Sequence, residues 1–104
     1  MDYIPSVLEI LKSATFEAWF NGLEDSQAQA RINARIRRLS LGNPGDVKPV
    51  GSGISEMRID YGPGYRVYYA QRGQALILLL VGGDKRTQDS DIKRAIASAK
   101  DWKR

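Results

Sequence analysis

The most apolar stretch of this chain constrains its fold more than any other feature. Residues 75–81 read Ala-Leu-Ile-Leu-Leu-Leu-Val without interruption. A run of this length is far below the roughly 18 residues that a membrane-spanning helix needs. A short, continuous apolar run is typical of a strand whose two faces are both covered. We therefore predict a central strand over residues 75–81 that is buried on both sides.

The remaining periodic segments predict the other strands of a sheet and three helices. Alternating residues predict a hairpin, Pro49 restricts its own segment to a sheet edge, and apolar residues at helical spacing mark the helices, with Thr15 as the first cap. The predicted strands are at residues 3–11, 47–50, 56–61 and 65–70, and the helices at residues 15–22, 26–41 and from 88 onward. The first two helices are expected to form an antiparallel pair.

Charge and missing residue types narrow the chemistry. The chain has 104 residues, which suits a single domain spanning 1–104, and it carries a formal net charge of +4 with a sequence pI of about 9.6. Such a balance favours an anionic partner. The chain has no cysteine and no histidine, which excludes a thiol or imidazole nucleophile and a structural zinc site. Without cysteine, a signal-peptide pattern or a membrane span, we expect a cytoplasmic protein with no membrane contact.

The predicted hairpin gathers charged side chains on one face of the sheet. Taking Gly-Pro-Gly at residues 62–64 as the loop places Asp60 opposite Arg66. The same register places Arg58 opposite Tyr68, with the apolar residues on the other face. Two interpretations remain open: a solvated face with cross-strand ion pairs, or a phosphate site where arginines donate and an aromatic ring stacks on a base.

Two further basic features also allow more than one interpretation. Residues 82–85, Gly-Gly-Asp-Lys, either turn the chain or let its backbone approach a ligand, although the full phosphate-loop pattern is absent. In the second helix Arg31, Arg35 and Arg38 repeat beside the apolar stripe. These arginines form either a solvated flank or a surface that faces a partner.

Four segments, which together span residues 15–102, carry a more specific pattern. They are TFEAWFNGL, ARINARIRRLSLGNPGDVKPVGSGISEMRIDYGPGYRVYY, LLLVGGDKRTQDSDIKRA and AKDW. In this pattern the chain resembles the RelE/ParE toxin superfamily, in particular its phage-derived, HigB-like addiction-module killer proteins. The resemblance implies an α+β, RelE-like fold: an N-terminal strand and a helical hairpin packed on a curved, mainly antiparallel sheet, with a C-terminal helix. It also implies that basic residues gather on the concave face of that sheet.

The resemblance assigns expected roles to individual residues. Arg66 matches the arginine that stabilises phosphate charge in RelE-type nucleases. The residues expected to be catalytic are Arg58, Arg66 and Lys85. Those expected to contact the RNA substrate are Asp60, Tyr68, Arg86 and Gln88. Those expected to bind an antitoxin are Arg31, Arg35 and Arg38.

The implied activity is that of a toxin of a type II toxin–antitoxin system, a ribosome-dependent mRNA endoribonuclease that inhibits translation. Its reaction is attack of a ribose 2'-hydroxyl on the adjacent phosphate, with no metal and no cofactor, and with Lys85 or Asp60 moving a proton. The implied partners are a helix-turn-helix antitoxin, the ribosome and mRNA, with operator DNA reached only through the antitoxin complex. Two alternatives remain: a ParE-like inhibitor of DNA gyrase, and a non-toxic nucleic-acid-binding accessory protein.

Overall fold

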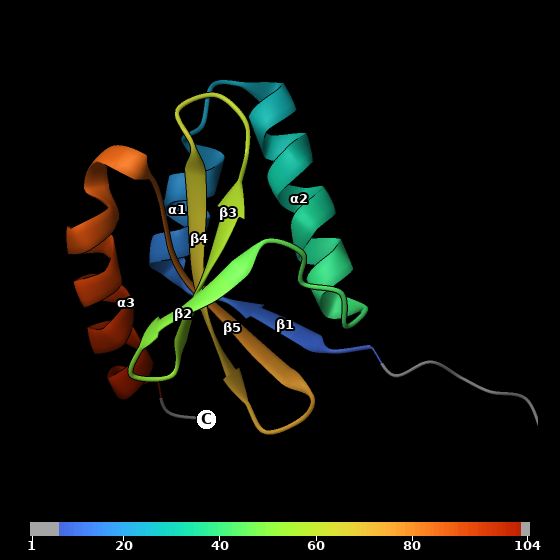
Figure 1. The fold of residues 1–104 in the computed structure, drawn as a ribbon, viewed down its shortest axis with the longest axis vertical. Coiled ribbons are helices and arrows are strands. Elements are labelled where there is room, and N and C mark those ends of the chain that lie inside the picture. The colour runs from blue at the N-terminus through green and yellow to red at the C-terminus, as the bar shows by residue number, and fades with distance from the viewer. Residues whose placement is uncertain (1–6, 103–104) are drawn as a thin grey trace, which may run out of the picture.

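The structure is a computed structural model that describes residues 7–102 and has an α+β fold (Figure 1). Within these residues one sheet contains β1 (Glu9–Lys12), β2 (Val47–Gly51), β3 (Ile54–Ile59), β4 (Tyr65–Arg72) and β5 (Leu76–Asp84). The helices are α1 (Ala14–Asn21), α2 (Ser26–Ser40) and α3 (Gln88–Asp101), the last preceded by a 3-10 turn, η1 (Lys85–Thr87). The predicted fold class is confirmed, and the architecture is consistent with a RelE-like fold. No helix in this part of the chain is long and apolar enough to cross a bilayer.

The strands lie in the order β1-β5-β4-β3-β2. β1 runs parallel to β5, and the other neighbouring strands are antiparallel. The predicted edge strand is confirmed, because β2 ends the sheet beside β3. The middle position belongs to β4, and β5 lies between β1 and β4. The first strand begins at Glu9, later than predicted, and residues 3–6 of its predicted range lie outside the described residues.

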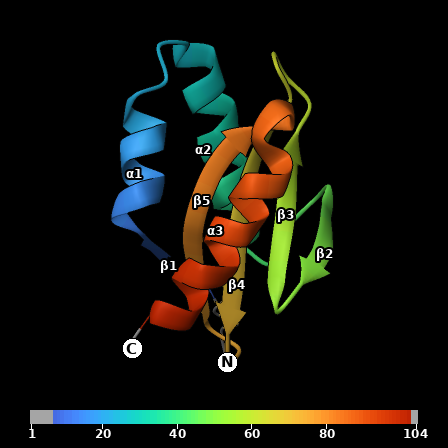
Figure 2. The same cartoon turned by 90° about the vertical axis from the view of Figure 1, so that its left-hand side faces the viewer.

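Helices cover both faces of the sheet, so the core has two parts (Figure 2). On one face α1 and α2 pack against alternate strand residues, among them Met57, Val67 and Leu79. On the other face α3 packs against the intervening residues, among them Leu78. Residues 77–81 of β5 are buried on both sides. The interpretation of the apolar run as a doubly covered strand is confirmed.

A bulge in β5 decides where its last residues point. Tyr68 pairs with Val81 and Tyr69 pairs with Leu79, so Leu80 is an extra residue in this strand. Leu80 and Val81 therefore both belong to the part of the core beneath α3. An extra residue reverses the alternation for every position after it, and this reversal orients the two glycines that follow.

These glycines continue β5 instead of forming a loop. A Cβ atom on Gly82 would overlap the indole ring of Trp19 on α1, and one on Gly83 would overlap the carboxylate of Asp91 on α3. Both positions are thus restricted to glycine by the close approach of a helix on each side. The two glycines lie within a strand, so the expected turn does not begin at them.

Side chains at the strand ends fix where the helices begin. Ser13, and not the predicted Thr15, caps α1: its Oγ accepts a hydrogen bond from the Phe16 amide (2.9 Å) and donates one to the Leu80 carbonyl (2.6 Å). The predicted starts of α2 and α3 are confirmed. At the end of β5, Asp84 caps η1, so α3 starts almost directly from the sheet. This connection brings the first residue of α3 beside β3 and β4.

Candidate functional site

The β3–β4 turn determines which charged side chains are neighbours. Arg58 lies opposite Arg66, so the predicted pairs Arg58–Tyr68 and Asp60–Arg66 are wrong. β3 ends at Ile59, two residues earlier than predicted, whereas β4 begins at Tyr65 as predicted, so the connecting loop covers residues 60–64. Because the register shifts by two residues, each residue that remains in a strand stays on its predicted face, and the predicted grouping of Arg58, Arg66 and Tyr68 on one face is confirmed.

Local hydrogen bonds and two glycines make this longer loop. The Tyr61 amide donates to the Ile59 carbonyl (2.9 Å), and the Gly64 amide donates to the Tyr61 carbonyl (3.2 Å). Gly62 and Gly64 have φ of 58° and 81°, which side-chain-bearing residues rarely adopt. The chain therefore leaves β3 before Asp60, which becomes an exposed loop residue.

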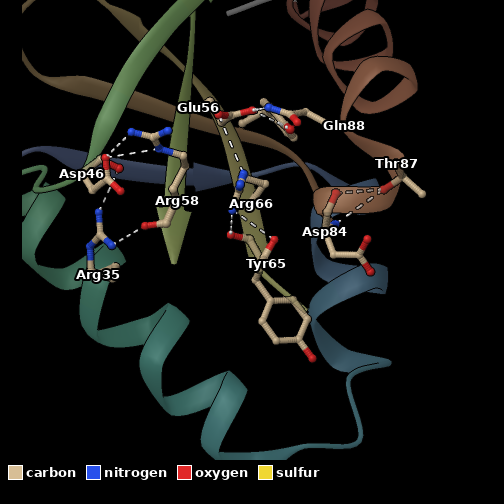
Figure 3. A network of polar contacts seen from close by, with 11 residues as sticks. Arg35, Asp46, Glu56, Arg58, Tyr65, Arg66, Asp84, Thr87 and Gln88 are labelled. Carbon is tan, nitrogen blue, oxygen red and sulfur yellow. Dashed lines mark hydrogen bonds and ion pairs between the residues drawn. The ribbon is translucent and has the colours of Figure 1, made fainter. Parts of the chain in front are cut away.

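A cavity of ≈ 470 Å³ opens at this end of the hairpin. Its charged lining residues are Arg58, Arg66, Lys85, Asp46 and Asp60. Figure 3 shows Arg58 and Arg66 on adjacent strands, with Asp46 beside Arg58. The structure thus brings together the three residues that the sequence predicts to be catalytic, and adds two carboxylates at their margin.

Arg66 is the more enclosed of the two cavity arginines. Its side chain is 13% exposed, against 39% for Arg58. Its Nη1 donates to the carbonyls of Gly64 (3.1 Å) and Tyr65 (3.3 Å), and its Nε faces Oε1 of Glu56 at 3.8 Å. No residue of the described chain accepts a hydrogen bond from Nη2. That nitrogen is the part of the guanidinium left for a ligand in the cavity.

Arg58 is held by a carboxylate, and that carboxylate lies on an anchored loop. Its Nε and Nη2 donate to Oδ1 of Asp46 at 3.2 and 2.8 Å, which lowers the pKa of the Asp46 carboxyl and raises the pKa of Arg58. From α2, Arg35 donates Nη1 to the Arg58 carbonyl (2.6 Å) and Nη2 to the carbonyls of Pro44 (3.0 Å) and Asp46 (3.3 Å). Arg35 thus fastens the loop that positions Asp46.

Lys85 and Arg86 are adjacent in η1 but have different environments. Lys85 is exposed and lines the cavity. Arg86 donates Nε to Oδ1 of Asp84 (3.3 Å) and Nη2 to Oδ2 (3.0 Å), and these hydrogen bonds lower the pKa of the Asp84 carboxyl. Arg86 lines a smaller hollow at the start of α3, to which Lys85 also contributes. Of the two cations, the structure brings only Lys85 to the cavity that contains Arg66.

Tyr68 and Gln88 meet at a carboxylate that the sequence analysis did not single out. Glu56 is fully buried, and its Oε2 accepts hydrogen bonds from the Tyr68 hydroxyl (3.0 Å) and from Nε2 of Gln88 (2.7 Å) (Figure 3). Burial, together with this hydrogen bond, raises the pKa of the Tyr68 hydroxyl. The Tyr68 ring is also fully buried, so it presents no face to the cavity. The sequence feature that could have identified Glu56 is the alternation of β3, which places Glu56 on the same face of the sheet as Arg58.

The three α2 arginines that are expected to bind an antitoxin are not equivalent. The guanidinium of Arg31 lies 4.6 Å from the centre of the Tyr61 ring and stays exposed. Arg38 is also exposed, whereas Arg35 points inward to the carbonyls described above. The helix contains no acidic residue. Its outer surface therefore presents Arg31 and Arg38 as a positive strip.

Comparison with known proteins places this chain in a family. Residues 18–103 match the family described as phage derived protein Gp49-like (DUF891). An uncharacterised protein of Haemophilus influenzae is 52% identical over 88 residues, which cover 85% of this chain and 89% of that protein. The Gp49-like family lies within the RelE/HigB-like toxin superfamily and suggests a toxin-like protein with an antitoxin partner. This chain belongs to the Gp49-like family of phage-derived proteins.

Proposed function

We propose that this protein is the toxin of a type II toxin–antitoxin system and that it cleaves messenger RNA on the ribosome. The observation that carries the proposal is the convergence of Arg58, Arg66 and Lys85 on one cavity. Three cations around an open cavity suit a ligand with several negative charges, and a polynucleotide backbone supplies them. Membership of a family within a toxin superfamily supports the toxin part of the proposal.

The proposed reaction is a transesterification within the RNA. The 2'-oxygen of one ribose attacks the adjacent phosphorus, and the bond from that phosphorus to the 5'-oxygen of the next nucleotide breaks. The proton of the 2'-hydroxyl passes to a base, and the leaving 5'-oxygen takes up a proton. The products are a 2',3'-cyclic phosphate and a 5'-hydroxyl. Cations that bind the extra negative charge on the phosphate oxygens lower the barrier.

Arg66 is the residue proposed to hold the reacting phosphate. Its Nη1 and Nε face the turn and Glu56, so the guanidinium is oriented before RNA binds, with Nη2 free to donate. Lys85 and Asp60 line the same cavity and are the groups proposed to move the two protons. Arg58 adds a second guanidinium once it exchanges the Asp46 carboxylate for a phosphate.

The proposed protein partner is a helix-turn-helix antitoxin whose acidic segment lies along α2. Arg31 and Arg38 are exposed there, and α2 contributes no carboxylate of its own. Charge complementarity of this kind favours rapid association and a defined orientation. Operator DNA would then be contacted through the antitoxin and not by this chain.

Induced expression followed by mapping of transcript ends tests the proposed activity. We expect growth arrest and new 5'-hydroxyl ends within translated messages. Arg66→Ala should lose roughly 100- to 1,000-fold in cleavage rate, the usual effect of removing one donor to a developing oxyanion. Arg66→Lys should recover only part of it, since an ammonium cannot supply the oriented guanidinium fork.

A matched control separates site chemistry from loss of charge. Arg37→Ala removes an exposed arginine of α2 and should leave cleavage unchanged. Full cleavage by a folded Arg66→Ala protein would contradict the proposed site. Double-strand DNA breaks without new RNA ends would instead identify a gyrase inhibitor.

A further inference from the structure

Glu56 has two unusual features: it is a fully buried carboxylate, and one of its oxygens lacks a hydrogen bond. Its Oε2 is saturated by Tyr68 and Gln88, while Oε1 accepts no hydrogen bond from any residue between 7 and 102. Buried charged oxygens are normally paired, because desolvation without compensation is costly. The free oxygen therefore indicates what this carboxylate is placed to do.

The nearest cationic group to that oxygen is Nε of Arg66, at 3.8 Å. This Nε is also buried and also without a hydrogen-bond partner among the described residues. Two buried, oppositely charged atoms that each lack another partner and face one another form an ion pair. Figure 3 shows Glu56 above Arg66, with Gln88 beside Glu56.

From this arrangement we propose that Glu56 is a positioning residue for Arg66: it orients the guanidinium so that Nη2 is presented to the phosphate. Tyr68 and Gln88 hold the carboxylate, and the carboxylate holds Nε, so α3 contributes to the cavity through Gln88. Glu56 does not line the cavity, so it does not contact the substrate. The proposal builds on the proposed RNA cleavage, since it concerns the same arginine.

Glu56→Gln is the most direct variant, because it keeps the shape of the side chain and removes its charge. The amide can still accept from Tyr68 and Gln88 with its oxygen, which turns its NH₂ group toward Arg66 Nε, donor against donor. A misplaced guanidinium should lower the cleavage rate at saturating RNA by on the order of 10- to 100-fold. The apparent affinity for RNA should be unchanged or tighter, since the variant loses one negative charge.

Arginine side-chain NMR gives a readout that does not depend on cleavage. The Arg66 Nε–H signal, assigned by its loss in Arg66→Lys, should be sharp and slow to exchange with water in the wild-type protein. It should broaden or exchange faster in Glu56→Gln and, to a smaller degree, in Gln88→Met, which keeps the carboxylate but removes one of its donors. Glu24→Gln makes the same chemical change at an exposed position and should alter neither the signal nor the rate.

The outcomes distinguish this inference from the proposed function. A wild-type protein that cleaves no ribosome-bound mRNA would overturn the proposed function, and the Arg66 signal would still decide the role of Glu56. An unchanged Arg66 Nε–H signal in folded Glu56→Gln would overturn the positioning role. So would a loss of RNA affinity with an unaltered maximal rate. If Glu56→Gln does not fold, an unchanged Arg66 signal in Gln88→Met is the contradicting result.

Discussion

At the scale of single residues, Gly82 shows how the lack of a side chain supports the strand next to the candidate site. It lies near the end of β5, where the indole of Trp19 packs directly on the strand backbone. Trp19 in turn contacts the ring of Tyr65, with ring centres 6.2 Å apart. Tyr65 is the residue that precedes Arg66, so the close approach of α1 supports the strand that carries the site.

Gly82→Ala should therefore destabilise the fold. The added Cβ would overlap the indole ring of Trp19, and overpacking of this kind typically costs about 1–3 kcal/mol of unfolding free energy. Denaturant unfolding of the variant measures that loss. Combining Gly82→Ala with Trp19→Leu should cost less than the sum of the two single changes, because the smaller side chain relieves the overlap. A Gly82→Ala protein as stable as wild type would show that α1 can move away freely.

At the scale of elements, the hairpin shows what an alternating sequence determines and what it leaves open. Alternation with period two assigns each residue to a face, so Arg58 and Arg66 were correctly grouped. The same period cannot distinguish registers that differ by two residues, and Asp60 and Tyr61 fit a strand as well as a loop. The cross-strand partners were therefore predicted incorrectly while the faces were correct.

The burial of Glu56 and Tyr68 is a second property that the alternating sequence did not reveal. Glu56 and Tyr68 share the face of Arg58, and a charged residue in such a pattern is normally expected to face water. The structure covers this end of the face with Gln88 at the start of α3, so the polar groups pair inside the protein. Whether this face of the sheet is covered depends on the position of α3, which is distant in the sequence. The local alternation of β3 and β4 does not determine that position. The bulge at Leu80 was hidden for a related reason, because every residue around it is apolar.

The loop that connects α2 to β2 also affects the cavity, through Asp46. Asp46→Asn should free Arg58 from its carboxylate and raise the net charge at the cavity by one. We expect tighter binding of single-stranded RNA and a slope of log affinity against log salt that is steeper by roughly 0.7 for each additional phosphate contact. Asp101→Asn makes the same charge change at the exposed end of α3 and should leave the slope unaltered. Equal slopes for both variants would show that Asp46 does not compete with RNA.

The stability of the same variant gives a pH test. The Arg58 hydrogen bond lowers the pKa of the Asp46 carboxyl in the folded protein. The stabilisation from this carboxylate is therefore fully present above its unfolded pKa, about 3.9, and is lost as pH falls through the lower folded value. Wild type should be more stable than Asp46→Asn at neutral pH, and the difference should shrink below about pH 4. A difference that stays constant down to pH 2 would contradict the ion pair.

At the scale of the whole molecule, two separate basic surfaces bear on the proposed function. One is the cavity with Arg66 and Lys85 at the end of the hairpin, and the other is the outer surface of α2 with Arg31 and Arg38. Arg35 connects them structurally, because it belongs to α2 but donates to carbonyls beside Arg58. An antitoxin bound along α2 would therefore lie close to the loop that positions Asp46 without having to fill the cavity.

This division predicts that toxicity and antitoxin binding can be removed separately. Reversing the charge of Arg31 and Arg38 to glutamate should weaken antitoxin binding at least roughly tenfold, about 1.4 kcal/mol, because an acidic partner would then meet like charge. The same protein should cleave RNA normally and arrest growth even when its antitoxin is co-expressed. Arg66→Ala should show the converse behaviour, with full antitoxin affinity and no toxicity. Reversing Lys93 and Lys100, which are exposed on α3, matches the change in net charge and should affect neither property. If the Arg31 and Arg38 reversal leaves antitoxin affinity intact while Arg66→Ala abolishes it, the antitoxin instead covers the cavity, and inhibition would be direct occlusion of the RNA site.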